Sequence, residues 1–345
     1  MQPNRVMLFA LIIAGAANAQ LTGRGINFDK SFDTSEHEEG PIAALEEEIN
    51  RLNRAAAFDK TALQKEIDDL RIELGTRDQI KFRKVTYRST DGLAIPAYLF
   101  EPEATGQYPA IVDVHGGQHG SVSSRSLQRT IDWVQAGYVI LAPDYRGSSG
   151  YSESYYDKAD YGGKEIDDIL AAVDYLETQP SVRQGRVGII GGSHGGYNAL
   201  MAIIRYPDRF RAAVDLFGPT DLVYRLTATP GENANTSPGD VEYFASMVGQ
   251  TIDAAPELYE QRSPRYLADR IRVPLLILHG EKDQVVKVQE SLWLVEALEK
   301  SGNTQFEFEI LAGANHGWPA ELWKPGYERA KAFLDRYLRQ KDSPM

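Results

Sequence analysis

The sequence predicts an α/β protein in which helices cover both faces of a mostly parallel sheet of eight strands. The main observation is a series of short, continuous apolar runs, which are typical of strands buried on both faces of a sheet. These runs lie at 109–117, 138–147, 186–193, 211–218, 273–280 and 306–311. Segments with helical periodicity separate several of them, at 166–177, 197–206 and 288–300. Strands that alternate with helices are typical of a parallel sheet.

The first two strands are expected to form a hairpin. KFRKVTYRS (81–89) and LAIPAYLFEP (93–102) flank Asp91-Gly92, and Asp-Gly between two such segments is a strong signal for a tight turn. With the six later runs, the hairpin gives eight strands in one domain, which we expect to extend over residues 80–340.

Residues 20–79 predict a helical extension ahead of this domain. Apolar residues recur there at helical spacing in two runs: Leu45, Ile49, Leu52 and Ala56, then Leu63, Ile67, Leu70 and Leu74. Asp59-Lys60-Thr61 interrupts the runs, and Thr61 with Gln64 fits a capping box for a second helix. One interpretation is a coiled-coil arm that makes a homo-oligomer through these helices. We favour a helical hairpin packed on the domain, because each run is shorter than the three heptads that indicate a coiled coil.

Residues 1–19 have the features of a cleavable signal peptide in the right order. Arg5 precedes an apolar core over 6–17, and Ala17 and Ala19 form an A-x-A site that predicts cleavage after Ala19. A buried N-terminal helix fits this order less well, and the core is too short for a membrane anchor. We therefore expect a periplasmic or secreted protein that is not held in a membrane after cleavage.

The composition excludes several classes of function. The net charge of −12 disfavours nucleic-acid binding, because attraction to phosphates needs clustered Lys and Arg. The chain has no cysteine, so no disulfide, thiolate nucleophile or Cys-ligated metal is expected. His115 and His119 have a metal-ligand spacing, but the two glycines between them argue against a helix and so against a metal site. We expect no cofactor.

Ser193 is the candidate nucleophile. In GIIGGSHGGYNAL (188–200) it lies between four glycines, where a predicted strand is followed by a predicted helix. Gly191-Gly192-Ser193-His194-Gly195 fits the G-x-S-x-G elbow, in which small neighbours let strand and helix approach while the serine adopts a strained conformation. A phosphate-binding loop is the alternative, but neither G-x-G-x-x-G nor a P-loop lysine is present.

Asp283 and His316 are the candidate partners of this serine. A serine hydroxyl needs an imidazole to take its proton and a carboxylate to orient that imidazole, here in the order Ser, acid, His. Asp283 follows the strand at 273–280, and His316 lies just past the last strand. Taken singly, Asp283 could be a helix N-cap and His316 a surface residue. Because a serine, an acid and a histidine occur in the expected order, each just after a predicted strand, we interpret them as a catalytic triad.

Two backbone N–H groups are expected to bind the oxyanion of the tetrahedral intermediate. One is that of His194, the residue after the nucleophile. The other comes from the loop that follows an earlier strand, where Gly117 is our choice and Gly116 is an alternative.

These stretches together resemble the catalytic domain of the prolyl oligopeptidase family of serine peptidases, most closely its acylaminoacyl-peptidase-like members. The matching pieces are HGG (115–117), DYRGSSGYS (144–152), DYGGKEIDDILAAVDYL (160–176), GRVGIIGGSHGGYNAL (185–200), RSPRYL (262–267), HGEKD (279–283) and ANHGW (314–318). The likeness covers residues from about 80 to about 340, in the family's order. It implies an α/β-hydrolase fold with Ser193, Asp283 and His316 as the triad.

The chain departs from this family in two respects. The family's peptidases usually carry a large N-terminal β-propeller, whereas residues 20–79 have a helical pattern. Some members also place a tyrosine hydroxyl in the oxyanion hole, where this chain has HGGQ (115–118). We expect a secreted serine hydrolase that cleaves peptide or acyl-aminoacyl bonds through an acyl-enzyme on Ser193. A carboxylesterase for small acyl esters is the alternative, and a hydrolase-fold protein without activity is remote. Deleting residues 20–75 should leave activity on a small ester largely intact.

Overall fold

The computed structural model describes residues 39–228 and 238–340. The predicted signal peptide lies outside these residues. The chain divides into two compact units, Met1–Arg54 and Ala55–Met345. The second unit contains every strand found among the described residues, and it includes residues 55–79 as well as the domain expected over 80–340. Among the described helices, none is long and apolar enough to cross a membrane.

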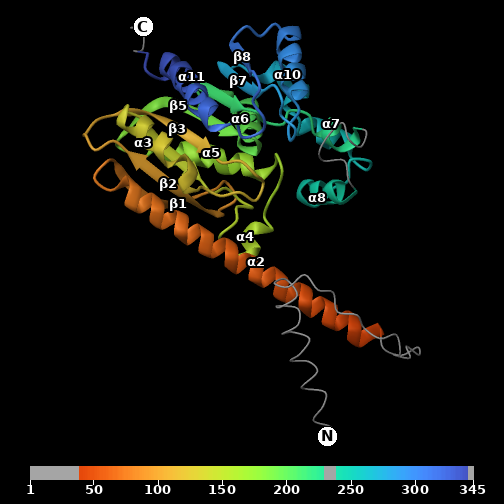
Figure 1. The fold of residues 1–345 in the computed structure, drawn as a ribbon. Helices are drawn as coiled ribbons and strands as arrows, with labels where there is room; N and C mark the ends of the chain where they lie inside the picture. The colour runs from red at the N-terminus through yellow and green to blue at the C-terminus, as the bar shows by residue number, and fades with distance from the viewer. Residues whose placement is uncertain (1–38, 229–237, 341–345) are drawn as a thin grey trace. The chain divides into compact units, whose positions relative to one another are not determined.

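The second unit is built on one eight-stranded sheet in the order β1-β2-β4-β3-β5-β6-β7-β8 (Figure 1). The strands are β1 (Lys81–Arg88), β2 (Ala94–Glu101), β3 (Tyr108–Val114), β4 (Val139–Pro143), β5 (Val182–Gly192), β6 (Ala212–Leu216), β7 (Leu275–Gly280) and β8 (Phe306–Leu311). β2 runs antiparallel to both β1 and β4, and every other pairing is parallel. The predicted sheet and its hairpin at Asp91-Gly92 are confirmed.

Helices cover both faces of the sheet and enclose two apolar cores (Figure 1). One core contains α5 (Lys164–Glu177), α6 (His194–Arg205) and α10 (Val288–Lys300), which the sequence predicts. The other contains residues of α3 (Leu127–Gln135) and α11 (Ala320–Leu338), which the sequence analysis does not identify. The shorter helices are α4 (Glu153–Tyr156), α7 (Leu222–Thr227), α8 (Pro238–Val248) and α9 (Pro256–Gln261).

The predicted helical hairpin is wrong, because α2 is one continuous helix from Glu39 to Thr76. Thr61 does not cap a second helix. Its hydroxyl instead donates to the Phe58 carbonyl oxygen at 2.9 Å, one turn earlier in the same helix. Asp59-Lys60-Thr61 therefore lies inside α2.

The face of α2 that packs on the domain is also different from the face that the apolar pattern predicts. Lys65, Asp68, Ile72 and Thr76 are buried, whereas the four apolar residues of the second run are exposed. Ile72 joins the core that contains α3 and α11. Helix α2 is thus held on its domain largely by polar groups.

Candidate active site

The nucleophile elbow forms where β5 ends and α6 begins. Ser193 has φ 57° and ψ −123°, a strained conformation for a residue with a side chain. Its neighbours have no room for a Cβ: one on Gly191 would lie 2.1 Å from the Gly195 carbonyl oxygen, and one on Gly195 would lie 2.1 Å from that of Val114. The Ser193 N–H donates to the Leu216 carbonyl oxygen at 2.8 Å. The glycines therefore allow the close approach that the sequence predicts.

The three predicted triad residues form a continuous hydrogen-bonded chain. His316 Nε2 lies 3.0 Å from Ser193 Oγ, and His316 Nδ1 lies 2.7 Å from Asp283 Oδ2. Ser193 follows β5, Asp283 follows β7, and His316 follows β8. Because the carboxyl ends of parallel strands meet at one edge of the sheet, Asp283 and Ser193 reach the two ring nitrogens of His316. They lie 33 and 123 positions before it in the sequence.

Asp283 is held as a buried carboxylate. Its Oδ1 accepts from the N–H groups of Val285 at 2.8 Å and Val286 at 2.9 Å, and His279 Nε2 lies 3.6 Å from Oδ2. Burial alone would raise the pKa of Asp283, but the contacts with His279, His316 and the backbone hold that pKa well below its usual range. Asp283 is not a helix N-cap, since α10 is preceded by Lys287.

Backbone and aromatic contacts fix the position of His316. Asn315 Oδ1 accepts from the N–H of His316 at 2.8 Å and from that of Gln284 at 3.2 Å, which ties the two loops that carry the base and the acid. The Phe217 ring lies edge-on to the imidazole, with centroids 4.9 Å apart. Phe217 and Trp318 both have positive φ, 48° and 29°, so backbone strain adjoins the base on two sides.

The HGG loop lies directly against the elbow. A Cβ on Gly116 would be 2.8 Å from the Gly192 carbonyl oxygen and 3.4 Å from Ser193 Cβ. The Tyr145 hydroxyl lies 3.1 Å from the carbonyl oxygens of both His115 and Gly117, so it holds this loop from behind. The candidate oxyanion donors on Gly116 and Gly117 thus adjoin Ser193 as His194 does, and the choice between the two glycines stays a prediction.

A buried ionic network supports the same loop from α2. Lys65 Nζ lies 2.5 Å from Asp144 Oδ2 and donates to the Val122 carbonyl oxygen at 2.8 Å. Asp144 also accepts from the Val122 N–H at 2.6 Å and from the Tyr151 hydroxyl at 2.6 Å. His115 Nε2 lies 3.6 Å from Asp144 Oδ1. Burial lowers the pKa of His115 to about 4, so this imidazole is neutral near pH 7.

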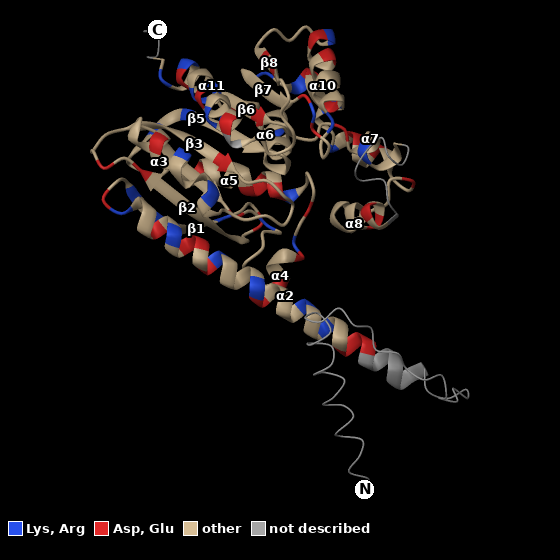
Figure 2. Cartoon of the chain, viewed as in Figure 1, with Lys and Arg blue, Asp and Glu red and all other residues tan. Residues whose placement is uncertain are grey.

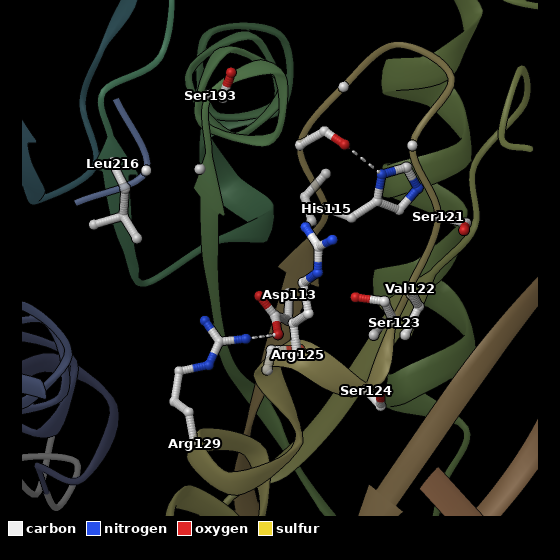
Figure 3. A pocket seen from close by; sticks show the side chains of 18 of the residues that line it. Asp113, His115, Ser121, Val122, Ser123, Ser124, Arg125, Arg129, Ser193 and Leu216 are labelled. Atoms are coloured by element: carbon white, nitrogen blue, oxygen red, sulfur yellow. Dashed lines mark hydrogen bonds and ion pairs between the residues drawn. The ribbon is translucent and has the colours of Figure 1, made fainter. Parts of the chain in front are cut away.

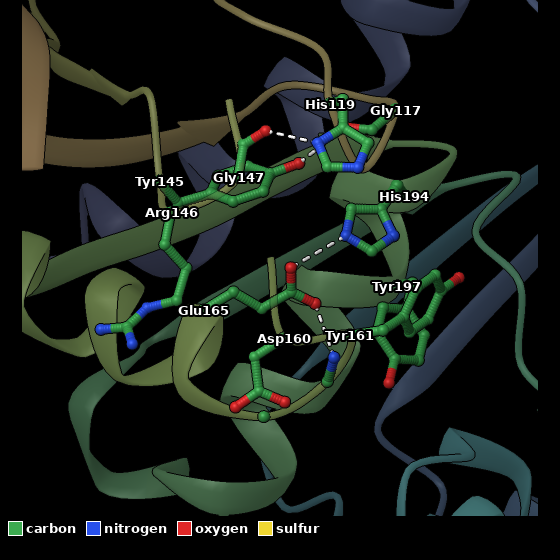
Figure 4. Close-up of polar contacts among 12 residues, drawn as sticks. Gly117, His119, Tyr145, Arg146, Gly147, Asp160, Tyr161, Glu165, His194 and Tyr197 are labelled. Atoms are coloured by element: carbon green, nitrogen blue, oxygen red, sulfur yellow. Dashed lines mark hydrogen bonds and ion pairs between the residues drawn. The ribbon is translucent and has the colours of Figure 1, made fainter. Parts of the chain in front are cut away.

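The other histidines of the glycine-rich loops have structural partners (Figure 4). His194 Nε2 lies 3.1 Å from Glu165 Oε2, and this side chain is buried away from the reacting serine. His119 Nδ1 lies 2.7 Å from the Gly147 carbonyl oxygen, and its ring stacks on Tyr156. No group of three or more His, Cys, Asp or Glu side chains within 39–228 and 238–340 is arranged to hold a metal ion.

A cleft of about 980 Å³ opens onto Ser193 and His316 (Figure 3). One wall consists of residues from α2, namely Gln64, Asp68 and Arg71. Another is the serine-rich segment 121–126 with the start of α3. The aromatic residues Phe217, Trp323 and Tyr327 close the side next to His316. The hydrogen-bonded residues Ser193 and His316 thus lie in the wall of a cleft to which helix α2 contributes.

Several residues that support the site carry no catalytic signal in the sequence. Tyr145, Arg146, Tyr197 and Trp318 flank the motifs, yet all four are buried and none lines the cleft. Arg146 pairs with Asp168, and the Tyr197 hydroxyl donates to the Arg262 carbonyl oxygen. These residues lie outside the cleft, and three of them hold the segments around it by hydrogen bonds or an ion pair. The only sequence feature that could have indicated the contact of Tyr145 with the HGG loop is its position in the DYRG segment 144–147.

The model of the prolyl oligopeptidase family matches residues 125–341, which is more than half of the chain. The chain belongs to this peptidase family. The match includes Ser193, Asp283 and His316, in a family of serine hydrolases with the α/β-hydrolase fold. A second model, that of acetyl xylan esterase, matches residues 56–165.

Relatives in the prolyl oligopeptidase family include peptidases of several kinds. Dipeptidyl aminopeptidase BIII of Pseudoxanthomonas mexicana is 30% identical over 68% of this chain and 35% of its own length. The acylamino-acid-releasing enzyme of Arabidopsis thaliana is 30% identical over 64% of this chain and 28% of its own. A solved puromycin-hydrolyzing peptidase of Mycobacterium tuberculosis is 27% identical, with a TM-score of 0.68 over 76% of this chain and 40% of that one. The chain thus spans about a third of the length of these curated relatives.

Proposed function

We propose that this chain hydrolyses peptide or acyl-aminoacyl bonds through an acyl-enzyme on Ser193. The observation that carries the proposal is the continuous chain from Ser193 Oγ through His316 to Asp283, at distances of 3.0 and 2.7 Å, in the wall of the cleft. A hydroxyl on a strained elbow beside a carboxylate-oriented imidazole is the arrangement that activates serine.

The geometry supports the following order of events. Ser193 Oγ attacks the substrate carbonyl carbon while His316 Nε2 takes the hydroxyl proton. Backbone N–H groups of Gly117 and His194 stabilise the oxyanion as the tetrahedral intermediate forms. The C–N or C–O bond breaks as His316 returns the proton to the leaving group. Water then attacks the acyl-enzyme with His316 as base, and the acid product leaves.

Asp283 acts by orienting and stabilising His316. Its carboxylate is buried and already has two backbone donors on Oδ1, so Oδ2 is left facing the imidazole Nδ1. A fixed anion at this position favours the tautomer whose Nε2 is free to accept the serine proton, and stabilises the imidazolium that follows.

An esterase acting on small acyl esters is the second candidate. The match of the acetyl xylan esterase model to residues 56–165 favours it, because that stretch includes the HGG loop and two walls of the cleft. The same residues would serve both reactions. An amide demands more of His316, since its leaving nitrogen must be protonated as it departs. We further propose export to the periplasm or the medium, on the signal-peptide features of residues 1–19.

The test is kcat/KM for one acyl group presented both as an aryl ester and as an anilide, with Ser193→Ala as control. We expect the wild type to cleave both and the variant to cleave neither. Turnover of the ester alone would make the chain an esterase. Equal activity of the Ser193→Ala variant would overturn the mechanism.

A further inference from the structure

Arginine side chains outnumber carboxylates in the lining of the cleft. Three guanidinium groups and two carboxylates line it, although the whole chain is strongly acidic. Arg129 forms an ion pair with Asp113. Asp68 accepts from the N–H and the hydroxyl of Ser124, at 3.1 and 2.6 Å, and lies in the field of Arg71. Among the described residues of the cleft, Arg71 and Arg125 have no ion pair, and of these two only Arg71 acts on a carboxylate, that of Asp68.

Arg125 has the position and the freedom to bind an anion. It lies in the 3-10 turn Ser124–Ser126, and its side chain is exposed. Its guanidinium makes no hydrogen bond or ion pair within the described ranges. In Figure 3 the Arg125 side chain extends toward the loop of His115, whereas Arg129 turns to Asp113. A guanidinium matches a carboxylate in shape and charge and binds it with two parallel hydrogen bonds.

We propose that Arg125 binds a carboxylate of the substrate, so that the enzyme prefers esters or amides with an anionic group near the scissile bond. This inference rests on the proposed function and names its substrate class. The exposed arginine loses little hydration before binding, and the nearby hydroxyls of Ser121 and Ser123 add donors in the same wall. An ion pair at an exposed site of this kind discriminates a charged from an uncharged substrate by about 2- to 5-fold.

Two matched substrate pairs test the proposal. The first pair is a 4-nitroanilide whose acyl part is capped with succinyl or with acetyl. The second is an amide of 4-aminobenzoate or of 4-aminobenzamide, which moves the carboxylate to the leaving group. We expect the charged member of at least one pair to have the higher kcat/KM. In Arg125→Gln the preference should disappear, because kcat/KM falls for the charged substrate and stays the same for the uncharged one. Arg270→Gln, which removes an exposed arginine outside the cleft, should keep it.

The outcomes are distinguishable from failure of the proposed function. If the wild type cleaves both members of each pair equally, or if the preference survives in Arg125→Gln, the role of Arg125 is refuted while the hydrolase stands. If the wild type cleaves no member of either pair and no ester, the proposed function fails and the substrate class fails with it.

A second, independent observation is the apolar stripe of α2, defined as Leu63, Ile67, Leu70 and Leu74. These side chains are 59, 36, 58 and 61% exposed. They lie opposite the face that packs on the domain, and their 4-3-4 spacing is that of the d and a positions of a coiled coil. In the other unit, Ile49 and Leu52 are exposed as well. Within residues 55–228 and 238–340, nothing covers the stripe.

The charges beside the stripe favour a second copy of the chain as its occupant. Asp59, Glu66 and Glu73 follow one edge at seven-residue spacing, and Arg71 lies on the other edge. Charged residues of both signs are visible along α2 in Figure 2. In a parallel pair, Glu66 of one copy faces Arg71 of the partner subunit across the seam, once on each side. In an antiparallel pair the acidic edges would face each other.

We infer that two chains associate in parallel through the stripe of α2. Sedimentation equilibrium on the full chain should show a dimer, and Leu70→Lys should make it a monomer with an unchanged circular dichroism spectrum. Glu66→Arg should weaken the dimer by tenfold or more, because it places like charges across the seam twice. Adding Arg71→Glu should restore it. A wild-type monomer at about 100 µM, a dimer unaffected by Leu70→Lys, or a double variant weaker than Glu66→Arg would each overturn the inference.

Discussion

Lys65 provides a quantitative test of how α2 is attached to its domain. Its side chain is 5% exposed, and its ammonium lies between Asp144 and the Val122 carbonyl oxygen. In Lys65→Met the aliphatic stem keeps its packing, but Asp144 loses its countercharge and the Val122 oxygen loses its donor. Removing one partner of a buried ion pair costs about 3–5 kcal/mol, because the remaining charge stays buried. We expect a loss of that size in the free energy of unfolding.

The assay is urea unfolding of the Ala55–Met345 unit within the full chain, followed by tryptophan fluorescence. Lys60→Met is the matched control, since Lys60 is exposed on the same helix, and it should change the unfolding free energy by less than about 0.5 kcal/mol. Lys65→Met combined with Asp144→Asn should recover part of the loss by removing the unpaired carboxylate. A loss below about 1 kcal/mol in Lys65→Met would refute the reasoning.

The same variant has a consequence for activity. Asp144 also binds the Val122 N–H and lies near His115, so the network connects α2 to the loop that carries the oxyanion donors. Lys65→Met should therefore lower kcat more than it raises KM. The expectation that residues 20–75 are dispensable is accordingly replaced by a sharper one. Deleting 20–54 should be tolerated, and deleting 55–75 should not, because the latter belong to the catalytic unit.

Three further predictions concern the site and its surroundings. Asp283→Asn should lower kcat/KM for an anilide by roughly 10⁴-fold, since His316 loses the carboxylate that selects its tautomer. Tyr145→Phe should lower kcat/KM about tenfold at nearly unchanged KM, because the HGG loop loses the hydroxyl whose proton is shared between two of its carbonyl oxygens. Burial raises the pKa of Asp215 from 3.8 to about 7. Between these two pKa values the folded protein keeps a proton that the unfolded chain releases. The free energy of unfolding should therefore fall as the pH rises from 3.8 to about 7. Urea unfolding of Asp215→Asn should show a flatter pH profile there.

The sheet and the triad could be predicted because each rests on a local pattern. The parallel strands are apolar runs, and Ser193, Asp283 and His316 each follow one of them directly. Once the strands are known to be parallel, their ends must meet at one edge, so the closeness of these three residues follows without knowledge of any side-chain contact. The positive φ of Ser193 agrees with the strained conformation that the G-x-S-x-G pattern predicts.

The role of α2 could not be predicted because its packing reverses the usual rule. Hydrophobic periodicity assigns the leucine face to the domain, yet Lys65 and Asp68 occupy that interface and the leucines are exposed. Lys65 is buried only because Asp144, 79 positions later in the sequence, supplies a countercharge at 2.5 Å. Such a pairing leaves no trace in local periodicity. The helix break expected at Asp59-Lys60-Thr61 failed for a related reason, since Thr61 bonds back within the helix.

The central claim is that Ser193 is a nucleophile activated by His316 and Asp283. The most direct measurement is reaction of the full chain with a fluorophosphonate, followed by peptide mass mapping. We predict one adduct per chain, on Ser193, with a labelling rate that falls at least a hundredfold in His316→Ala, where no base takes the hydroxyl proton. A chain that is not labelled, or that is labelled on another residue, would contradict the account.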